Sequence, residues 1–191
     1  MGNISTSYLG AKKLSGKDIR TQGSGNAGST NVMRNYGKKA GAMTFAGDLL
    51  KGILAVFIGQ FIAKFMGLNV IVAGYWAVVG VVCGHNWPAV LGFRGGKGVA
   101  TLLGVGFGLI PIPALIALGI FMVVLFCFGY VSLASITAAV TLPFVTYFFV
   151  MPDNILLLLL TIAVAIFLPI THRQNIKRLL DGTENKFLKK K

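Results

Sequence analysis

Of the 191 residues in this chain, 55% are hydrophobic and only 12% are charged. Soluble domains carry about a quarter charged residues, so the composition excludes an ordinary soluble fold. A net charge of +13 is compatible with nucleic acid, anionic lipid or an anionic substrate. The basic residues alternate with long apolar runs instead of forming one arm or face, which argues against nucleic acid as a partner.

The amino-terminal part of the chain is polar. Residues 1–22 contain no run long enough to cross a bilayer and no signal-peptide pattern, and their lysines favour the cytoplasm. Residues 23–34, GSGNAGSTNVMR, combine three glycines with short hydroxyl and amide side chains and end on an arginine. Glycine lets a backbone come close to a ligand, and these side chains supply hydrogen-bond donors. The segment predicts a loop that binds a small anion.

The apolar runs that follow predict an all-α membrane bundle. A bilayer core of about 30 Å needs about 20 helical residues, so a shorter run crosses only as an unusually short helix. The run at 99–110 is the shortest, so it is either a short crossing helix or a re-entrant one, and Pro111 and Pro113 end it. Residues 130–135 and 151–154 are predicted turns. The six predicted spans are 41–67, 69–84, 99–110, 114–128, 136–150 and 155–170.

The distribution of charge favours the crossing alternative. Six spans place the loops at 12–39, 85–98 and 129–132 and the tail from 171 on one side of the membrane, together with nearly every Lys and Arg. Basic loops stay in the cytoplasm, whereas a re-entrant helix at 99–110 would put the basic tail outside. We therefore expect four polar segments, and the carboxyl terminus, at the cytoplasmic face.

Two glycine patterns need to be distinguished from nucleotide-binding motifs. Gly23, Gly25 and Gly28 spell G-x-G-x-x-G, but no strand pattern precedes them, so a dinucleotide site is rejected. Residues 92–98, GFRGGKG, resemble a phosphate loop, but Gly98 stands where Ser or Thr would bind Mg²⁺.

What remains at residues 92–98 is a set of glycines with Arg94 and Lys97, directly before a predicted helix at Val99. Backbone amides at a helix start beside a cation bind phosphate well. The alternative is that the glycines only pack helices and the cations only set topology.

The histidines differ in context. His85 ends a predicted span, where a lone histidine is more often a packing or hydrogen-bonding group than a catalyst. His172 and Asn175 fall on one helical face, with Arg178 at its edge. A plain interfacial basic helix is the alternative, but it does not explain Asn175.

The cysteines and histidines give no sign of a bound metal. Cys83 and Cys127 lie in apolar runs and are expected to be small buried hydrophobes without a disulfide. Two histidines and two cysteines do not have metal-ligand spacing, so neither a metal nor a cofactor is expected.

Three stretches together resemble one family. Residues 18–34 (DIRTQGSGNAGSTNVMR), 84–101 (GHNWPAVLGFRGGKGVAT) and 172–186 (HRQNIKRLLDGTENK) are similar to the signature motifs of the bacterial acyl-phosphate:glycerol-3-phosphate acyltransferases, the PlsY family. We call them the first, second and third motifs. They occur in family order, and the resemblance runs from about residue 8 to residue 187.

The resemblance implies a single integral-membrane acyltransferase domain over residues 1–191, in the bacterial inner membrane. It implies transfer of a fatty acyl group from acyl phosphate to the 1-hydroxyl of glycerol 3-phosphate, which yields lysophosphatidic acid and phosphate, the first acylation of phospholipid synthesis. Membrane lipid and a soluble enzyme that makes acyl phosphate are the further partners implied. The family has seven transmembrane helices, so the first helix is expected to be truncated here.

The resemblance also implies residue roles. Glu184 is implied to be structural. The implied catalytic residues are Ser24, Arg34, Lys97, Ser132, His172 and Asn175. The implied substrate-binding residues are Gly23, Gly25, Asn26, Thr30, Asn31, Gly95, Gly96 and Gly98.

The residues themselves fit this chemistry. Acyl phosphate is already activated, so no ATP site is needed. Arg34 and Lys97 are expected to hold phosphates while Ser24 and backbone amides stabilise the developing oxyanion. The general base is either His172 or a substrate phosphate.

Two other classes stay open. An organic-phosphate transporter would also need basic glycine-lined loops, but the chain shows no internal repeat and its polar residues gather at one interface. A scaffold with basic lipid-binding loops would leave Asn26, Asn31 and Asn175 unexplained.

Overall fold

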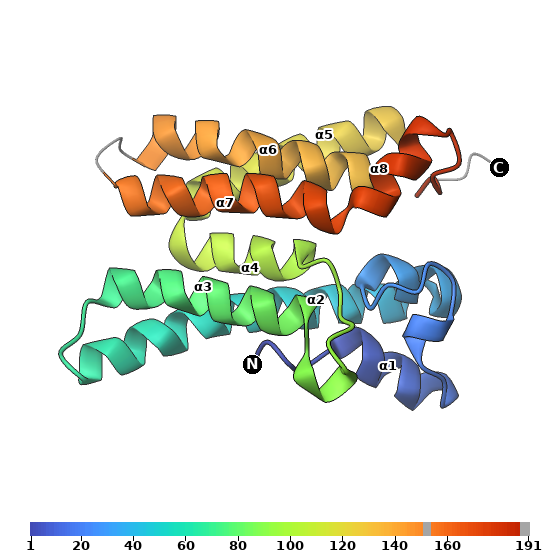
Figure 1. The fold of residues 1–191 in the computed structure, drawn as a ribbon, viewed down its shortest axis with the longest axis horizontal. Coiled ribbons are helices and arrows are strands. Elements are labelled where there is room, and N and C mark those ends of the chain that lie inside the picture. Colours follow the sequence, from blue (N-terminus) through green and yellow to red (C-terminus); the bar gives the residue numbers. More distant parts are fainter. Residues whose placement is uncertain (151–153, 188–191) are drawn as a thin grey trace. The chain divides into compact units, whose positions relative to one another are not determined.

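A computed structural model describes residues 1–150 and 154–187, and across these residues the chain is helical, without a strand (Figure 1). This confirms the predicted all-α class. The chain divides into two compact units, Met1–Leu109 and Ile110–Lys191, while the expected single domain over 1–191 stays a prediction. The helices of the first unit are α1 (Thr6–Ser15), η1 (Ile19–Thr21), α2 (Ser29–Phe65), α3 (Val70–Asn86), η2 (Ala89–Leu91) and α4 (Val99–Leu109).

The longest helix, α2, begins earlier than the sequence predicts. The predicted span starts at residue 41, but the structure places the first helical turn at Ser29, so the second half of the predicted anion-binding loop is helical. Gly28 caps the helix in extended conformation, and Val32 on the first turns is fully buried in a small apolar cluster with Ile19 and Ala27. That local burial, which hydropathy averaged over a span does not reveal, favours the helix.

Close approach of backbones joins α2 to α4. A Cβ at Gly52 of α2 would overlap the carbonyl oxygen of Thr101, and a Cβ at Gly104 of α4 would overlap the carbonyl oxygen of Leu49. Small residues let helices meet at backbone distance, which is the usual packing in membranes. α2 also packs against α3, so it forms the centre of the first unit.

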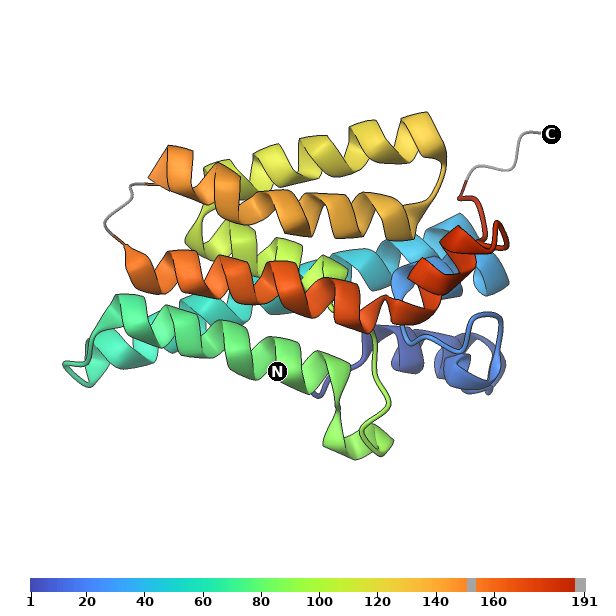
Figure 2. The ribbon, with the colours of Figure 1, turned by 45° about the horizontal axis from the view of Figure 1, so that its top comes forward.

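The second unit consists of α5 (Pro111–Phe128), α6 (Val131–Val150), α7 (Ile155–Thr171) and α8 (Arg173–Leu180), and α6 packs against both α5 and α7 (Figure 2). Pro111 is the first residue of α5, a position where the missing N–H costs nothing, and thus starts this helix as well as ending the run before it. The predicted turn at 130–135 is wrong because α6 already begins at Val131, which places Ser132 on its first turn. α7 and α8 meet at a 60° bend. The predicted turn at 151–154 lies largely outside the described residues.

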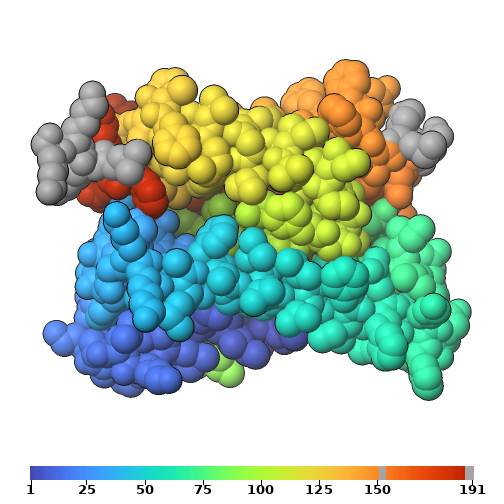
Figure 3. All heavy atoms as spheres, turned by 180° about the vertical axis from the view of Figure 1, so that it is seen from behind, coloured from blue at the N-terminus to red at the C-terminus, as the bar shows by residue number. Residues whose placement is uncertain are grey.

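Within the described residues, four helices are long and apolar enough to cross a membrane, or five if the bent pair α7–α8 is one span. The shorter α4, with 11 residues, is apolar as well. The count of six spans and the side of each loop therefore stay predictions. Large apolar side chains are exposed along the outer faces, such as that of α2 seen from behind in Figure 3, as expected for helices that face lipid.

The two cysteines correct one expectation. Cys83 and Cys127 are both free thiols, but both are exposed on helix surfaces instead of buried. The physical reason is that an apolar run in a membrane helix has an outward face too, so hydrophobicity alone does not indicate burial inside the protein.

Candidate functional site

The first motif is organised by Asn31, whose side chain is buried near the start of α2. Its Nδ2 donates to the carbonyl oxygens of Ile19 at 3.2 Å, Gln22 at 3.0 Å and Asn26 at 3.0 Å. Its Oδ1 accepts from the backbone N–H of Ser24 at 3.1 Å. Asn31 therefore holds the 19–26 loop in shape, and a structural role accounts for its contacts.

The same loop depends on glycine. Gly23 and Gly25 both have positive φ, at 54° and 69°, which is the left-handed region that favours glycine. A Cβ at Gly23 would overlap the Asn31 amide. Ser24 lies between these two glycines with its side chain exposed, and Asn26 and Thr30 follow it, half-buried.

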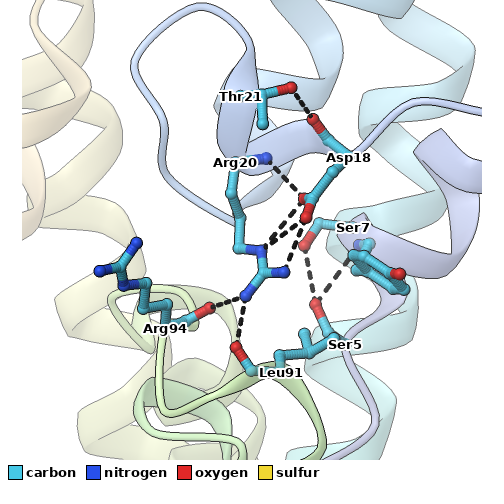
Figure 4. A network of polar contacts seen from close by, with 8 residues as sticks. Ser5, Ser7, Asp18, Arg20, Thr21, Leu91 and Arg94 are labelled. Atoms are coloured by element: carbon cyan, nitrogen blue, oxygen red, sulfur yellow. Dashed lines mark hydrogen bonds and ion pairs between the residues drawn. The ribbon is translucent and has the colours of Figure 1, made fainter.

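Arg20, which the sequence analysis did not single out, connects the first motif to the second (Figure 4). Its Nη2 lies 2.7 Å from Asp18 Oδ2, and its Nη1 donates to the carbonyl oxygens of Leu91 and Arg94. The hydrogen bond from Arg20 lowers the pKa of the Asp18 carboxyl. The only sequence signal was the acid–base pair two residues apart, a spacing that is common in loops.

The second motif folds its glycines against the end of α3. Gly95 N–H donates to Asn86 O at 3.0 Å and Gly96 N–H donates to His85 O at 3.1 Å. These two amides are bonded to the protein itself, so they are not among the helix-start amides expected to bind phosphate. Gly98, with φ 84°, comes next and leads into α4.

A side chain at these glycines would meet neighbouring atoms. A Cβ would lie 2.6 Å from Pro88 Cδ at Gly95, 2.7 Å from Ala27 O at Gly96 and 2.9 Å from Asn86 Oδ1 at Gly98. The contact with Ala27 means that Gly96 also touches the first motif. The structure thus brings the first and second motifs together at one end of the first unit (Figure 1).

This end of the first unit has the chemistry of an anion site. The first amides of a helix have no partner within the helix, and α4 starts directly after Lys97 and Gly98. The Lys97 side chain is half-buried, and Arg34 on the second turn of α2 is exposed. The first unit therefore combines a helix start and two cations with loops of fixed shape.

In the second unit, three side chains converge on Glu184. Ser132 Oγ donates to Glu184 Oε1 at 2.9 Å, Asn175 Nδ2 donates to the same oxygen at 2.7 Å, and Arg178 Nε donates to Oε2 at 2.7 Å. Burial raises the pKa of the Glu184 carboxyl, but these three hydrogen bonds outweigh it and leave the pKa below its ordinary value. The structure brings Ser132 and Asn175 together through a carboxylate, which supports the structural role implied for Glu184.

His172 lies at the bend between α7 and α8 and is 3% exposed. Its Nδ1 is 2.9 Å from Leu168 O, and a carbonyl oxygen can only accept, so Nδ1 carries the proton and Nε2 is the basic nitrogen of the neutral ring. His172 and Asn175, which the sequence predicts to share one helical face, are both buried.

Within the described parts of the chain, no group of three or more His, Cys, Asp or Glu residues could hold a metal ion. The polar clusters of the two units are instead built from cations, amides, hydroxyls and single carboxylates.

Comparison with known proteins identifies the family. The family model described as glycerol-3-phosphate acyltransferase matches residues 1–182. The chain belongs to the glycerol-3-phosphate acyltransferase family.

Individual relatives agree with the family match. A glycerol-3-phosphate acyltransferase of Clostridioides difficile is 53% identical over 191 residues, which is 100% of this chain and 92% of the relative. One from Alkaliphilus metalliredigens is 46% identical over 190 residues, again 100% of this chain and 92% of the relative. The crystal structure of PlsY (YgiH), an integral membrane glycerol 3-phosphate acyltransferase in its glycerol 3-phosphate form, has a TM-score of 0.83 and 37% identity, and the match covers 98% of this chain and 92% of that one.

In this glycerol-3-phosphate acyltransferase family member, the sequence analysis missed Arg20 and named Arg178 only at the edge of the His172–Asn175 face, without its ion-pair partner. Arg20 and Arg178 each make an ion pair with an acid in their own motif. A search for opposite charges confined to one motif could have found both.

Proposed function

We propose that the chain transfers a fatty acyl group from acyl phosphate to the 1-hydroxyl of sn-glycerol 3-phosphate. The acceptor oxygen attacks the acyl carbonyl carbon and forms the ester bond, while the bond from that carbon to the phosphate oxygen breaks. The products are lysophosphatidic acid and inorganic phosphate. The observation that carries the proposal is the contact between the first and second motifs, in a chain of this family.

The anion site of the first unit supplies the binding groups. Lys97 and the amides at the start of α4 hold the phosphate of glycerol 3-phosphate, and Gly95, Gly96 and Gly98 give that segment its shape. Arg34 binds the phosphate of the donor through its fork of N–H groups. Ser24, exposed between two left-handed glycines, stabilises the developing oxyanion.

The remaining residues of the first motif are assigned by their environment. Asn26 and Thr30 are half-buried beside the loop and contact substrate, as do Gly23 and Gly25 through their backbone. Asn31 acts through the loop that it holds.

The proton acceptor is assigned to one of two groups. His172, whose basic nitrogen is Nε2, takes the hydroxyl proton, or a substrate phosphate takes it. Ser132 and Asn175 orient substrate groups from the Glu184 cluster. A pH–rate profile of His172→Gln separates the two bases, because an unchanged acidic limb excludes His172 as the base.

We place the enzyme in the bacterial inner membrane with its polar loops and carboxyl terminus in the cytoplasm. Nearly all Lys and Arg residues lie in those loops, which is the positive-inside pattern. The acyl chain then enters sideways from the lipid, and a soluble enzyme that makes acyl phosphate delivers the donor.

The test uses the purified chain in lipid with labelled glycerol 3-phosphate and one donor at a time: acyl phosphate, acyl-CoA or acyl carrier protein. Label in lysophosphatidic acid with acyl phosphate alone is the expected result. Transfer from acyl-CoA or acyl carrier protein in place of acyl phosphate would contradict the donor assignment. Uptake of label into sealed vesicles without acylation would support an organic-phosphate transporter instead.

A further inference from the structure

A buried polar network lies behind the second motif and is not used by the proposed chemistry. Lys51 Nζ on α2 is 2.7 Å from Asp48 Oδ1 and 2.7 Å from His85 Nδ1 on α3. It also donates to Ile4 O at 2.9 Å, and Thr6 Oγ1 donates to Asp48 Oδ1 at 2.8 Å. Asp48, Lys51 and His85 are each exposed by 6% or less.

The burial of these three ionisable side chains is costly and has to be explained. Ionisable side chains inside apolar helices are costly, and replacing a buried ion pair by apolar residues of similar size is often neutral or stabilising. Many other positions on α2 and α3 pack with apolar side chains. Helix packing alone would therefore not favour Asp48, Lys51 and His85.

The hydrogen bonds determine how His85 is presented. A lysine ammonium can only donate, so Nδ1 of His85 is the acceptor and the ring proton sits on Nε2. That Nε2 faces Gly96: a Cβ built there would overlap Nε2 and lie 2.9 Å from Cε1. The His85 carbonyl oxygen meanwhile accepts from Gly96 N–H at 3.1 Å. Gly96 is thus contacted by both the backbone and the ring of one residue.

The adjacent residue continues the same contact. Asn86 O accepts from Gly95 N–H at 3.0 Å, and the Asn86 side chain is the nearest group to a Cβ built at Gly98. The end of α3 therefore holds the glycine segment through hydrogen bonds and close packing. The ion pair on α2 in turn fixes the position of His85.

We propose that Asp48, Lys51 and His85 are positioning residues that hold Gly95–Gly98 in the conformation that binds the phosphate of glycerol 3-phosphate. The inference rests on the proposed function in its assignment of that phosphate to the second motif. It predicts a loss of affinity for glycerol 3-phosphate that is separable from any effect on the acyl donor.

The test compares three variants with the unaltered protein in detergent. His85→Asn keeps an acceptor for Lys51 but removes the ring that faces Gly96. The double variant Asp48→Asn with Lys51→Met removes both charges, so no unpaired charge is left to unfold the protein. Thr44→Val is the matched control, because Thr44 is buried one turn from Asp48 and its hydroxyl bonds only to Ala40 O within its own helix.

The measurements are KM for each substrate, kcat, the Kd for glycerol 3-phosphate by calorimetry, and hydrogen exchange over residues 92–98. We expect Kd and KM for glycerol 3-phosphate to rise about tenfold in both network variants. A change of this size corresponds to the loss of one hydrogen bond that holds the segment in its binding conformation. KM for acyl phosphate stays within about twofold, exchange over 92–98 increases, and the control changes none of these.

Unchanged Kd and unchanged exchange over 92–98, with only a lower unfolding temperature, would overturn the inference and leave the network as packing. The proposed function fails by a different result. If the unaltered protein binds glycerol 3-phosphate but accepts no acyl phosphate, the donor assignment is wrong, and the Kd comparison still decides the role of the network.

Discussion

The two units hold their polar residues in different ways. In the first unit, glycine segments shape the proposed phosphate site, and Arg20, Asn31 and His85 support those segments from behind. In the second unit Ser132 and Asn175 are themselves bonded to Glu184. Backbone geometry allows almost no substitution, whereas a carboxylate with three donors can lose one and keep the others. We therefore expect the largest losses of activity from substitutions in the first unit and smaller, graded losses in the second.

The largest effect is expected from Gly96→Ala. Its Cβ would overlap the His85 ring and the Ala27 carbonyl, so the segment must move, and a misplacement of about 1 Å costs roughly a hundredfold in rate. We expect kcat/KM for glycerol 3-phosphate to fall at least about a hundredfold. Gly80→Ala on α3 is the control, because, apart from its own helix backbone, no described residue lies within 4 Å of a Cβ built there. Equal activities of the two variants would break the comparison.

Arg20→Lys should reduce kcat/KM about tenfold. Lysine is a single point charge and cannot bond the Asp18 carboxylate and the carbonyl oxygens of Leu91 and Arg94 at the same time. The loss of this clamp should also increase hydrogen exchange over residues 89–98. As a control, replacement of an exposed lysine of α1, Lys13→Gln, should leave both measurements unaltered. A fall in activity with unchanged exchange would mean that Arg20 does not act by holding the second motif.

Glu184→Gln tests the graded behaviour of the second unit. The amide keeps the shape of the side chain but loses the charge that Arg178 pairs with, so the free energy of unfolding should fall by about 2 kcal/mol. Activity should fall only a few-fold, because Ser132 and Asn175 can still donate to the remaining carbonyl oxygen. Thermal unfolding and kcat/KM are the measurements, and Asp181→Asn, an exposed acid nearby, is the control. Loss of activity as complete as in Gly96→Ala would contradict the comparison.

The smallest effect is a dependence on pH that appears only in acid. The pKa of Glu184 is lower in the folded chain than its ordinary value near 4.5, so the unfolded chain binds more protons and stability rises with pH. The contribution of Glu184 to the free energy of unfolding is complete at pH values above the ordinary pKa. It is lost as pH falls through the lowered pKa of the folded chain. The pKa of Asp18 in the first unit is also lowered, so Asp18 likewise stabilises the folded chain less as pH falls.

Two variants separate these two contributions. Glu184→Gln should flatten the acid dependence of hydrogen exchange in residues 129–135, and Asp18→Asn should flatten it in residues 19–26. If either variant flattened both segments, the two carboxylates would not act locally.

Much of this fold could be predicted because membrane helices are long and apolar. The runs at 69–84, 99–110 and 155–170 lie within about two residues of α3, α4 and α7. The errors came where polar residues are helical: Asn31 and Ser132 sit on first turns that hydropathy treats as loop. Their helical state depends on tertiary contacts, Asn31 with the 19–26 loop and Ser132 with Glu184, and no local pattern encodes those partners.

The candidate site was predictable to a similar degree. The resemblance identified the three motifs, and His172 and Asn175, predicted from spacing to share a helical face, are both buried. It could not show that the amides of Gly95 and Gly96 are already bonded to α3, nor that Asp48 and Lys51 reach His85, because both facts depend on how two helices pack.

Gly37 has a mechanical consequence for Arg34. It interrupts α2 with φ 87° and ψ 170°. The turns that carry Arg34 and the long apolar helix beyond are therefore two helices that meet at a kink. Apart from its own helix backbone, no described residue crowds a Cβ built at this position, so the positive φ and not a lack of space favours glycine here. The direction in which the turns that carry Arg34 leave the rest of α2 therefore depends on two backbone angles of Gly37 that favour glycine.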